Sequence, residues 1–533
     1  MKHILHTLAI CIGVTFAASS CISLDTPPYG SESDATFWQE NENAAFATLN
    51  SCYTRFYSIY QMLESESATD NAYGKGVDKQ EPIGRGSLMA DNAYVKGMWD
   101  GFYAGIRTCN ELLNNIDKVP ENSLSKELRE RYIAEARVIR ASHYYELASR
   151  WGDVPYTEKV LSVNESREIG QTAYVTVMKN VTDELEAVLK SNALPAAYVN
   201  GERGRITSGA AKALLAKVYL FQGDFAKVRD LTQEIIDSKT YSLYPSYEGL
   251  FTVDGEYNSE IILDAEYAPV VREWSMRDAG FLPPSMGGYG GFGPTQELVD
   301  SYIMLNGKRI TDEGSGYDSN DPFAGRDPRL KMTVIYNGNS YATASGDHVI
   351  DTVSPDSRDA YGTTSDVTPT GYYLRKWYDK NTYVSSSTSA SINAIIIRYA
   401  DILLMNAEAH AELGTMSEGV WNNTVRLVRE RAGFTEAGAL NLPTGDVKEI
   451  IRNERRCELA FEGQRRKDII RWKIADKVMN GYIHGLYTGA ATGTDKGYVR
   501  LENRQFESGK HYLWPIPQKE IDLNPNLKQN PNW

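Results

Sequence analysis

The sequence predicts a mainly α-helical protein, in which helical hairpins form a scaffold and a long irregular segment of loops and short strands is inserted between them. Residues 208–238 and residues 399–432 each read as two helices joined at a glycine. The two segments share a pattern, Ala-x-x-Tyr-x-x-x-Gly in one and Ala-x-x-His-x-x-x-Gly in the other, that is typical of tetratricopeptide hairpins. Such hairpins stack into a superhelix with an extended face for binding.

Residues 1–20 have the features of a secretory signal. Lys2 gives a short positive region, and the stretch from Leu8 to Ala18 is apolar apart from one threonine. This stretch is too short to span a bilayer, and small residues then lead directly into Cys21. We therefore expect a bacterial lipoprotein signal peptide with Cys21 as the lipidated residue, although Ala18 stands where a leucine is usual. The alternative is an ordinary signal peptide cut nearby, which leaves a free cysteine.

The segments after the signal alternate between tether, helix and loop. Residues 21–36 contain Ser, Asp and Pro with little periodicity, and we expect a tether there. Helical spacing begins near Ala44, continues through Tyr60, and returns over residues 92–116 and 134–151. The apolar stripe of the last segment is wide, which predicts burial against more than one neighbour.

The segment 208–238 is predicted to fold as a helical hairpin. Thr207 or Ser208 can cap the first helix with a side-chain oxygen, and Gly223 with Asp224 supplies the turn. Several alanines in the first helix allow a neighbouring helix to approach closely.

We expect one domain over residues 37–533, divided into three parts. The helical scaffold comprises about residues 37–238 and 394–480. The irregular insertion, about 239–393, is dominated by Gly, Pro, Ser, Asp and Tyr and is expected on the ligand side, because loops on a rigid frame often carry binding residues. The segment of about 481–533 ends rich in Pro and Asn and is expected to wrap over the surface.

Composition excludes several classes of function. The formal net charge is −14, and no basic, aromatic-rich patch is concentrated enough to follow phosphates, so nucleic acid is not an expected partner. No later apolar run is long enough to span a membrane. Cys52, Cys109 and Cys457 are too few and too scattered for a disulfide framework; we expect them to pack as small apolar residues, although one pair could bridge.

Signatures of catalysis are weak. No HExxH, CxxC or G-x-S-x-G pattern occurs, so neither a zinc site nor the commonest hydrolase nucleophile is supported. Residues 288–293 spell G-x-G-x-x-G, but prolines precede them, and we expect a flexible loop that displays Tyr289 and Phe292. Glu64 and Glu66 could be imagined as glycosidase carboxylates, but alternate carboxylates are common in solvated loops. We expect no cofactor, no metal and no catalytic residue.

A dense run of charge lies near the end of the scaffold. Glu454, Arg455, Arg456 and Glu458 are followed by further arginines at 465 and 466. We expect a helix face with pairs inside the helix, rather than a ligand site.

Several segments together resemble the SusD/RagB-like nutrient-binding lipoproteins of Gram-negative bacteria of the Bacteroidota type. Their order and spread cover essentially all of the chain after the signal. The segments are Leu24–Pro27, Trp99–Ile106 with Cys109-Asn110, Ala134–Ala141, Arg150–Pro155, Asp327–Leu330, Gly371–Lys376, Arg398–Met405, Asn453–Arg456, Tyr512–Pro517, Asn524-Pro525 and Gln529–Pro531.

The resemblance implies a helical, tetratricopeptide-containing lipoprotein on the outer face of the outer membrane, without catalysis or an obligatory cofactor. It also implies a SusC-like TonB-dependent transporter as partner, for which such proteins capture glycans and act as a lid. A peptide-capturing member of the same family is the alternative, and a glycoside hydrolase is a further one.

Sugar recognition needs flat aromatic faces together with planar amides, carboxylates or arginines for the hydroxyl groups. Trp99, Trp151 and Trp514 lie in the scaffold segments, so we assign them to packing. Aromatic residues in loops, and polar residues close to them, are better candidates for ligand contacts. The predicted ligand-binding residues are Asp70, Asn71, Tyr73, Arg85, Asn92, Tyr94, Trp274, Tyr289 and Phe292.

Overall fold

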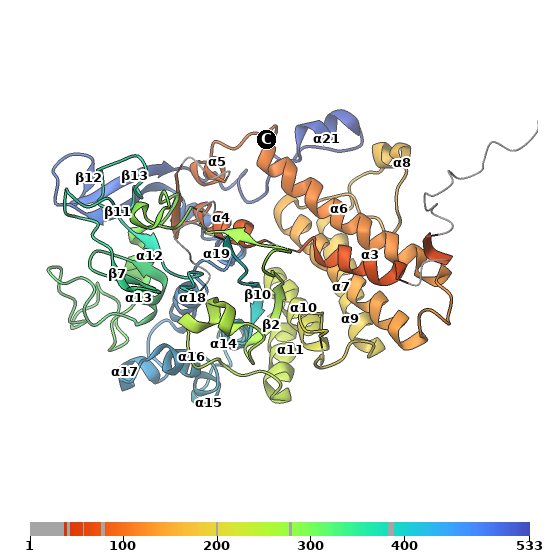
Figure 1. Ribbon diagram of the computed structural model, residues 1–533, viewed down its shortest axis with the longest axis horizontal. Helices are drawn as coiled ribbons and strands as arrows, with labels where there is room; N and C mark the ends of the chain where they lie inside the picture. The colour runs from red at the N-terminus through yellow and green to blue at the C-terminus, as the bar shows by residue number, and fades with distance from the viewer. Residues whose placement is uncertain are drawn as a thin grey trace, which may run out of the picture.

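The computed structural model describes residues 37–39, 43–56, 58–75, 80–198, 201–276, 280–381 and 389–533. Long helices, drawn in red to yellow, form one end of the molecule, and shorter helices joined by short strands form the other (Figure 1). The prediction of a mainly α-helical fold is confirmed. The predicted signal peptide, the tether and Cys21 lie outside the described residues. No helix of the described residues is long and apolar enough to cross a membrane.

The long end is a layer of helices that pack side by side. Its helices are α3 (Ala44–Tyr53), α6 (Ala93–Asn115), α7 (Lys126–Trp151) and α9 (Tyr174–Ser191). Helix α7 touches α3, α6 and α9, which explains why residues all around it are buried, as its wide apolar stripe predicted. The shorter elements of this half are α4 (Ile59–Ser67), β1 (Ala72–Gly74), α5 (Glu81–Arg85), η1 (Ile116–Lys118) and α8 (Val163–Glu168).

The expected helix from Ala44 to Tyr60 is two helices. Helix α3 ends at Tyr53 and α4 begins after Ser58. The Ser58 hydroxyl accepts the Gln61 backbone N–H, and the Gln61 side chain accepts the Ser58 N–H. This reciprocal capping starts a new helix where apolar spacing alone predicted continuation.

The predicted hairpin over 208–238 is confirmed. Helices α10 (Ser208–Gln222) and α11 (Phe225–Ser238) pack against each other. Thr207 caps the first by accepting the Ala210 N–H, and Gly223 turns the chain with φ of 79°. A positive φ costs glycine little, so this residue sets the turn.

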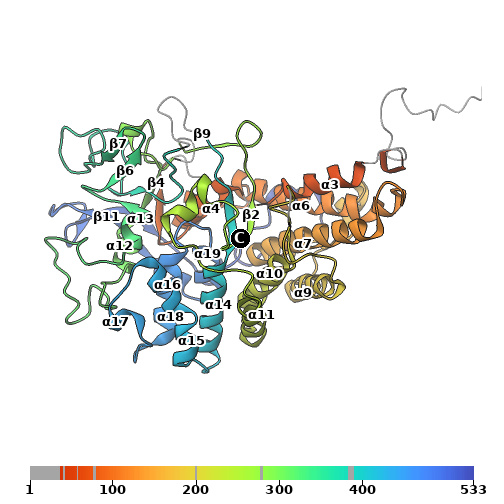
Figure 2. The same ribbon diagram turned by 60° about the horizontal axis from the view of Figure 1, so that its bottom comes forward.

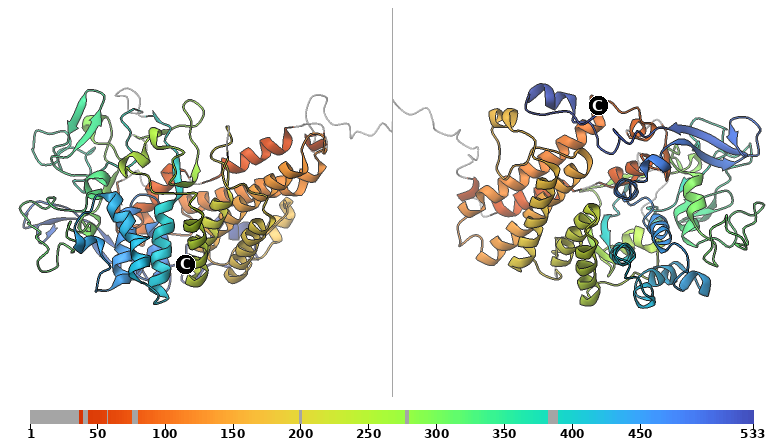
Figure 3. Two further views of the ribbon diagram at one scale, coloured as in Figure 1. Left: turned by 90° about the horizontal axis from the view of Figure 1, so that it is seen from below. Right: turned by 180° about the vertical axis from the view of Figure 1, so that it is seen from behind.

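The second predicted hairpin also turns at Gly414, but its second arm is broken. Helix α14 (Tyr399–Glu412) is followed by α15 (Glu418–Asn422) and α16 (Val425–Ala432). The break lies at Thr424, whose hydroxyl donates to the Val420 carbonyl oxygen at 2.6 Å and whose backbone is not helical. Helix α14 packs against α11, so the two hairpins adjoin, as the olive and cyan helices of Figure 3 show.

Short strands and turns fill the other end. The antiparallel pairs are β1 with β4 (Phe292–Pro294), β2 (Ile261–Ala265) with β10 (Ala394–Arg398), β3 (Trp274–Ser275) with β9 (Ser389–Ala390), β5 (Val334–Ile335) with β8 (Tyr373–Leu374), and β6 (Ser340–Thr343) with β7 (Gly346–Val349). A three-stranded sheet has the order β11 (Gly481–Tyr487), β13 (Tyr498–Arg504), β12 (Thr494–Asp495). The remaining helices are η2 (Glu248–Phe251), η3 (Val253–Gly255), η4 (Pro284–Met286), α12 (Gln296–Ser301), α13 (Arg329–Thr333), α17 (Ala437–Leu440), α18 (Val447–Glu458), α19 (Arg465–Arg471), α20 (Ala475–Val478) and α21 (Gln518–Leu523).

The C-terminal residues are fastened to the end of α7. The Trp151 indole Nε1 donates to the Pro515 carbonyl oxygen at 2.9 Å, and the Trp514 backbone N–H donates to the Arg150 carbonyl oxygen at 2.7 Å. Trp99, Trp151 and Trp514 are buried edge to face, with ring centroids 5.3 and 5.2 Å apart. Their predicted role in packing is confirmed. Helix α21 lies over the start of α6 (Figure 3, right).

The three cysteines are buried and free. The Cys457 thiol donates to the Ser301 carbonyl oxygen at 3.3 Å, and burial raises its pKa to about 12. Burial and the nearby Cys52 raise the pKa of the Cys109 thiol. The cysteines therefore pack as small buried residues, as expected, and such thiols are poor nucleophiles.

The charge run of α18 was expected to pair within its own helix, and that prediction is wrong. Glu454, Arg455 and Glu458 are buried, and they pair with charges on other elements. Helices α13 and α14 pack against α18, and α16 reaches it through arginine side chains, so complementary charges meet its buried side. We call the resulting set the central network. Its five cations and five carboxylates are Arg329, Lys376, Arg398, Arg429 and Arg431 with Glu260, Asp327, Glu454, Glu458 and Glu462.

Candidate functional site

The first predicted ligand residues lie between α4 and β1 and serve the scaffold. The Asp70 carboxylate accepts two hydrogen bonds of 2.8 Å from Arg465 and pairs with Arg456 at 3.0 Å. Burial raises the pKa of Asp70, but the two guanidiniums more than offset it and hold the pKa well below its usual range. Asn71 donates to Glu66 and accepts from Arg456. Both side chains are therefore buried and occupied by protein partners.

Tyr73 and Arg85 lie in a more accessible cluster. The Arg85 Nε donates to the Glu502 carboxylate at 2.6 Å, and the guanidinium also pairs with Glu81. Burial raises the pKa of the Tyr73 hydroxyl, and the negative charge of Glu502 raises it further. The cluster joins α5 to β13 and leaves part of Tyr73 and Arg85 open to solvent.

The pairing of β1 with β4 brings the segment 289–292 beside Tyr73. Tyr73 stands opposite Gly293, and Lys75 donates to the Tyr289 carbonyl oxygen at 3.5 Å and to the Val367 carbonyl oxygen at 3.0 Å. Phe292 is only 3% exposed, so the loop does not display it as expected. The last two residues of the G-x-G-x-x-G pattern lie in strand β4, whereas a dinucleotide site needs the pattern to lead directly into a helix, so the structure gives no support to such a site here.

The other predicted residues lie elsewhere. The Asn92 side chain caps α6 by accepting the backbone N–H groups of Tyr94 and Val95. The Tyr94 hydroxyl accepts a hydrogen bond from Gln80 Nε2 at 2.7 Å. Trp274 is buried, and its indole donates to the Ile392 carbonyl oxygen. The predicted residues thus fall into separate groups rather than one pocket.

A hollow with the composition of a sugar site lies at the end of the molecule away from α3. It has a volume of about 510 Å³, within the range of roughly 300–1,000 Å³ that is usual for small-molecule sites. We call it the tyrosine pocket. Figure 2 shows α12 and β11, which both contribute to its lining, beside one another. Its aromatic and polar lining is Gln296, Tyr317, Asn320, Phe323, Arg326, Asn337, Tyr372, Tyr487, Lys496 and Tyr498.

The aromatic rings of the tyrosine pocket differ in exposure. Tyr487 is 62% exposed, and its ring lies edge to face with Tyr498 at 5.3 Å. The Arg326 guanidinium lies 5.7 Å from the Tyr317 ring centroid. Tyr372 is buried and donates to Gln296 at 2.6 Å. Tyr487, Tyr498 and Tyr317 therefore present accessible ring surface, while Tyr372 forms the floor.

Polar groups accompany these rings. Asn320 lies in a polar turn closed by Asp318, which accepts the Asn320 backbone N–H at 2.9 Å. Asn337 and Lys496 are exposed at the rim. Amide and ammonium groups of this kind can hydrogen-bond to hydroxyl groups of a sugar.

A charged clamp holds the strand that carries Tyr487. His484 lies between two carboxylates, with Nδ1 2.6 Å from a Glu297 oxygen and Nε2 2.9 Å from an Asp495 oxygen. The hydrogen bond that His484 donates to Glu297, aided by the one that it donates to Asp495, raises the pKa of His484 to about 9, although partial burial opposes this. A cationic His484 thus ties β11 to α12 and β12 beside the tyrosine pocket.

Sequence reasoning did not find the tyrosine pocket. Tyr317 and Asn320 come from the insertion that we expected on the ligand side, but Tyr487 and Tyr498 come from the segment expected only to wrap the surface. The available signal was the tyrosine at each end of a glycine-rich turn between two strands. That turn brings the two rings together.

One contact set resembles a nucleophile triad but has different connections. The Ser285 hydroxyl donates to Asp359 at 2.5 Å and lies 2.8 Å from His348 Nε2. In an acyl-transfer triad the carboxylate orients the histidine, and the histidine activates the serine. Asp359 instead holds the serine, through both its hydroxyl and its backbone N–H. This geometry favours a structural role, in which Ser285 joins the segments that carry His348 and Asp359.

The carboxylates imagined as a glycosidase pair lie in helix α4. Glu66 is buried, and burial raises its pKa to about 7. Its carboxylate accepts a hydrogen bond from Asn71 at 2.9 Å. A carboxyl group enclosed in this way is not placed to meet a glycosidic bond. Among the described residues, no group of three or more His, Cys, Asp and Glu side chains could hold a metal ion.

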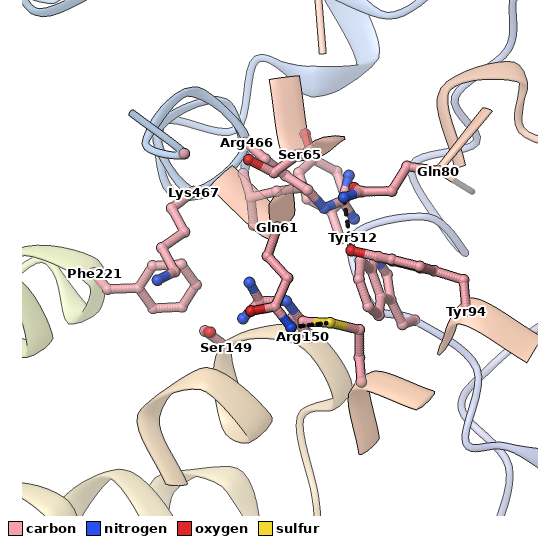
Figure 4. A pocket seen from close by; sticks show the side chains of 14 residues that line it. Gln61, Ser65, Gln80, Tyr94, Ser149, Arg150, Phe221, Arg466, Lys467 and Tyr512 are labelled. Carbon is pink, nitrogen blue, oxygen red and sulfur yellow. Dashed lines mark hydrogen bonds between the residues drawn. The ribbon is translucent and has the colours of Figure 1, made fainter. Parts of the chain in front are cut away.

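A second hollow, smaller and basic, lies where α4, α6, α7 and α19 meet (Figure 4). We call it the basic cavity. The cationic side chains of Arg150, Arg466 and Lys467 lie around it, together with Gln61 and Ser149. It has a volume of about 20 Å³, too small for a sugar.

Two family models match the chain. The model described as "SusD family" matches residues 253–533, and the one described as "Starch-binding associating with outer membrane" matches residues 38–220. SusD-like protein P25 of Formosa agariphila is 26% identical over 552 residues, which cover 99% of this chain and 98% of that protein. Starch-binding protein SusD of Bacteroides thetaiotaomicron is 25% identical over 457 residues, 78% of this chain and 75% of that protein.

Solved structures share the whole fold. A SusD-like carbohydrate-binding protein from Bacteroides fragilis superposes with a TM-score of 0.81 at 29% identity, covering 92% of this chain and 100% of its own. A laminarin-binding SusD-like protein superposes with a TM-score of 0.67 at 23% identity, covering 92% of this chain and 100% of its own. At that lower identity the likeness concerns the fold alone.

Proposed function

Because the chain belongs to the SusD family, we propose that it is a cell-surface glycan-binding lipoprotein that captures an oligosaccharide or polysaccharide. Members and neighbours of this family are named for binding starch, laminarin or other glycans. Family membership supports binding rather than catalysis, and the contacts of Ser285 and Glu66 give no independent support for hydrolysis.

The tyrosine pocket is the observation that carries the proposal for this chain. The exposed ring of Tyr487 and the half-buried rings of Tyr498 and Tyr317 offer flat apolar faces to the C–H face of a sugar ring. Asn320 and Asn337 lie close enough to serve the hydroxyl groups around that ring. A pocket of about 510 Å³ that opens to solvent suits one or two sugar units of a longer chain.

Of the residues predicted from the sequence, the partly exposed ones remain proposed ligand contacts. These are Tyr73, Arg85, Tyr94 and Tyr289. Asp70, Asn71, Trp274 and Phe292 are buried, and Asn92 caps a helix, which favours structural roles for them.

The test is calorimetric titration of the purified protein with a panel of polysaccharides and peptides. We expect a glycan to bind and Tyr487→Ala to weaken it about tenfold or more, because the variant removes a stacking face. Tyr482→Ala is a matched control, since Tyr482 lies exposed on the same strand but outside the pocket. Equal effects of the two variants would place the glycan elsewhere, and binding of peptides alone would favour the peptide-capturing alternative.

We also propose that the protein is lipidated at Cys21, faces the cell exterior and delivers its glycan to a SusC-like TonB-dependent outer-membrane transporter. The lipoprotein-like signal and the family resemblance support this. Palmitate labelling that persists in Cys21→Ala would disprove the anchor. Failure of the protein to co-purify with a transporter of that class from native membranes would disprove the partnership.

A further inference from the structure

The basic cavity has room for one small occupant. Its volume of about 20 Å³ exceeds the roughly 10–15 Å³ that a single water needs. The lining residues come from five helices, α4, α6, α7, α10 and α19, and from the C-terminal segment, so the cavity lies at the junction of the two halves of the molecule.

The lining of the cavity is positively charged. Arg150, Arg466 and Lys467 all line it, and no acidic side chain does so among the described residues. Glu146 contacts Arg150 and Lys467 from outside the lining. Within the part of the chain that the structure describes, the Arg466 guanidinium contacts the Trp514 ring, and no carboxylate lies within ion-pair distance of it. Arg466 is half-buried, and a guanidinium in that position without a carboxylate partner is uncommon, because removing a charge from water is costly unless the charge is paired.

An unused hydrogen-bond donor lines the same cavity. Trp514 is 2% exposed, and its indole Nε1 has no partner among the described residues. The guanidiniums of Arg150 and Arg466 each lie 5.5 Å from the Trp514 ring centroid. These cation–π contacts offset part of the charge, but an aromatic face is weaker than an ion pair and leaves the indole N–H unsatisfied.

We propose that the basic cavity binds one small monovalent inorganic anion of the size of chloride. Such an ion fits the volume, supplies the negative charge that Arg466 lacks, and accepts hydrogen bonds from the guanidinium and the Trp514 indole. A carboxylate-bearing or sulfated sugar is too large for it. A neutral water would satisfy donors but would leave the charge uncompensated.

The ion has a route to solvent. An open groove of about 1,010 Å³ shares four lining residues with the cavity, namely Ser149, Phe221, Ile470 and Tyr512. The proposed ion therefore exchanges through this groove. The site is separate from the tyrosine pocket and does not depend on glycan binding.

The test compares chloride with gluconate, an organic anion too large for the cavity, at constant ionic strength. We expect chloride to raise the melting temperature of the purified mature protein by about 1–3 °C in a saturable manner. In crystals soaked in bromide, we expect an anomalous peak within hydrogen-bonding distance of Arg466 and Trp514. Identical melting in the two salts together with no bromide peak, as a cavity holding only water would give, overturns the proposal.

Variants assign the effect to the cavity. Arg466→Gln is expected to abolish the chloride-dependent shift, whereas Arg309→Gln, at an exposed arginine outside the cavity, is expected to keep it. Trp514→Phe, which keeps a ring but removes the donor, is expected to reduce the shift. Retention of the full shift in Arg466→Gln contradicts the proposal. If that variant does not fold, the bromide peak in the wild-type protein decides.

Discussion

The central network holds fully buried arginines and the basic cavity half-buried ones, and the two regions compensate the positive charge differently. Arg398, in the network, pairs with Glu260, Glu458 and Glu462 at 2.6 to 2.8 Å. Arg466, in the cavity, faces an indole ring and no carboxylate within the described residues. The positive charges of the network are therefore balanced by carboxylates of the protein itself, whereas in our proposal the charge of Arg466 is balanced by an ion from solution.

The charged residues of the segments that resemble the family serve mainly to hold the helices together. Asp327–Leu330, Arg398–Met405 and Asn453–Arg456 meet in the interior and neutralise one another. A buried ion pair is a weak source of stability by itself, but the loss of one member leaves an uncompensated buried charge. The network therefore fixes how α13, α14 and α18 fit together.

The largest expected effect comes from breaking the network at its centre. Arg398→Met leaves three buried carboxylates short of a cation, and we expect the free energy of unfolding to fall by about 3–5 kcal/mol. Urea denaturation measures the change. Arg398→Lys, which keeps the charge but lacks the planar guanidinium, is expected to lose less. A loss below about 1 kcal/mol for the methionine variant would mean that the network is not held as described.

Lowering the pH tests the carboxylates of the central network, as the arginine variants test its cations. Three arginines hold the pKa of Glu458 well below its usual range, although burial opposes them. The stability that this carboxylate gives is complete above about pH 4.5 and is lost as pH falls. We expect Glu458→Gln to be less stable at neutral pH by about 3 kcal/mol and to show a flatter decline below pH 4.5. If the free energy of unfolding falls equally steeply below pH 4.5 in the variant and the wild type, this assignment is contradicted.

Alkali tests the basic cavity. Burial, and to a smaller extent Arg150, lower the pKa of Lys467 to about 8, while Glu146 opposes the shift. Between pH 8 and about 10.5 the unfolded chain keeps a proton that the folded chain has lost, so unfolding becomes harder as pH rises. Relative to Lys467→Met, the wild type should gain on the order of 2 kcal/mol over this window. A saturating anion should shift this pH window to higher pH, because it stabilises the charged form of Lys467. If the free energies of unfolding of the variant and the wild type change in parallel over this pH range, the pKa assigned to Lys467 is contradicted.

The smallest change in stability is expected at Arg466, and it gives the most direct comparison between the basic cavity and the central network. Without chloride, Arg466→Met should change the free energy of unfolding by less than about 1 kcal/mol, because it removes an uncompensated charge and keeps apolar contact with Trp514. The same substitution at Arg398 is expected to cost several times more. Urea denaturation of the two variants in gluconate makes the comparison. Similar losses would show that the two arginines are compensated alike.

The sequence predicted local structure better than distant contacts. The hairpin with Gly223 at its turn was predicted because its caps and periodicity lie within one short segment. The break before Ser58 was missed, since a capping pair can start a helix inside an apolar pattern. Arg398 and Glu260 are 138 positions apart, so no local sequence pattern indicates that they form a pair. The charge run of α18 was visible, but only the packing of other helices decided that it is buried.

The candidate site was predictable only in character. An aromatic and amide lining was expected, and the tyrosine pocket has one. Its residues were not identified, because Tyr317 and Tyr498 come together only after the insertion and the last sheet have packed. Asp70 was selected for its polarity, yet a carboxylate between two arginines is as polar in sequence as one that meets a ligand.

The three tryptophans at the end of α7 give the molecule an optical signature. Trp99, Trp151 and Trp514 are fixed edge to face across α6, α7 and the C-terminal segment. Indoles in such contact couple electronically and produce a circular-dichroism band in the near ultraviolet that vanishes when the rings separate. Since Trp514 also lines the basic cavity, entry of a heavy halide should dim its fluorescence. Light therefore reports both the docking of the last residues and the filling of the cavity.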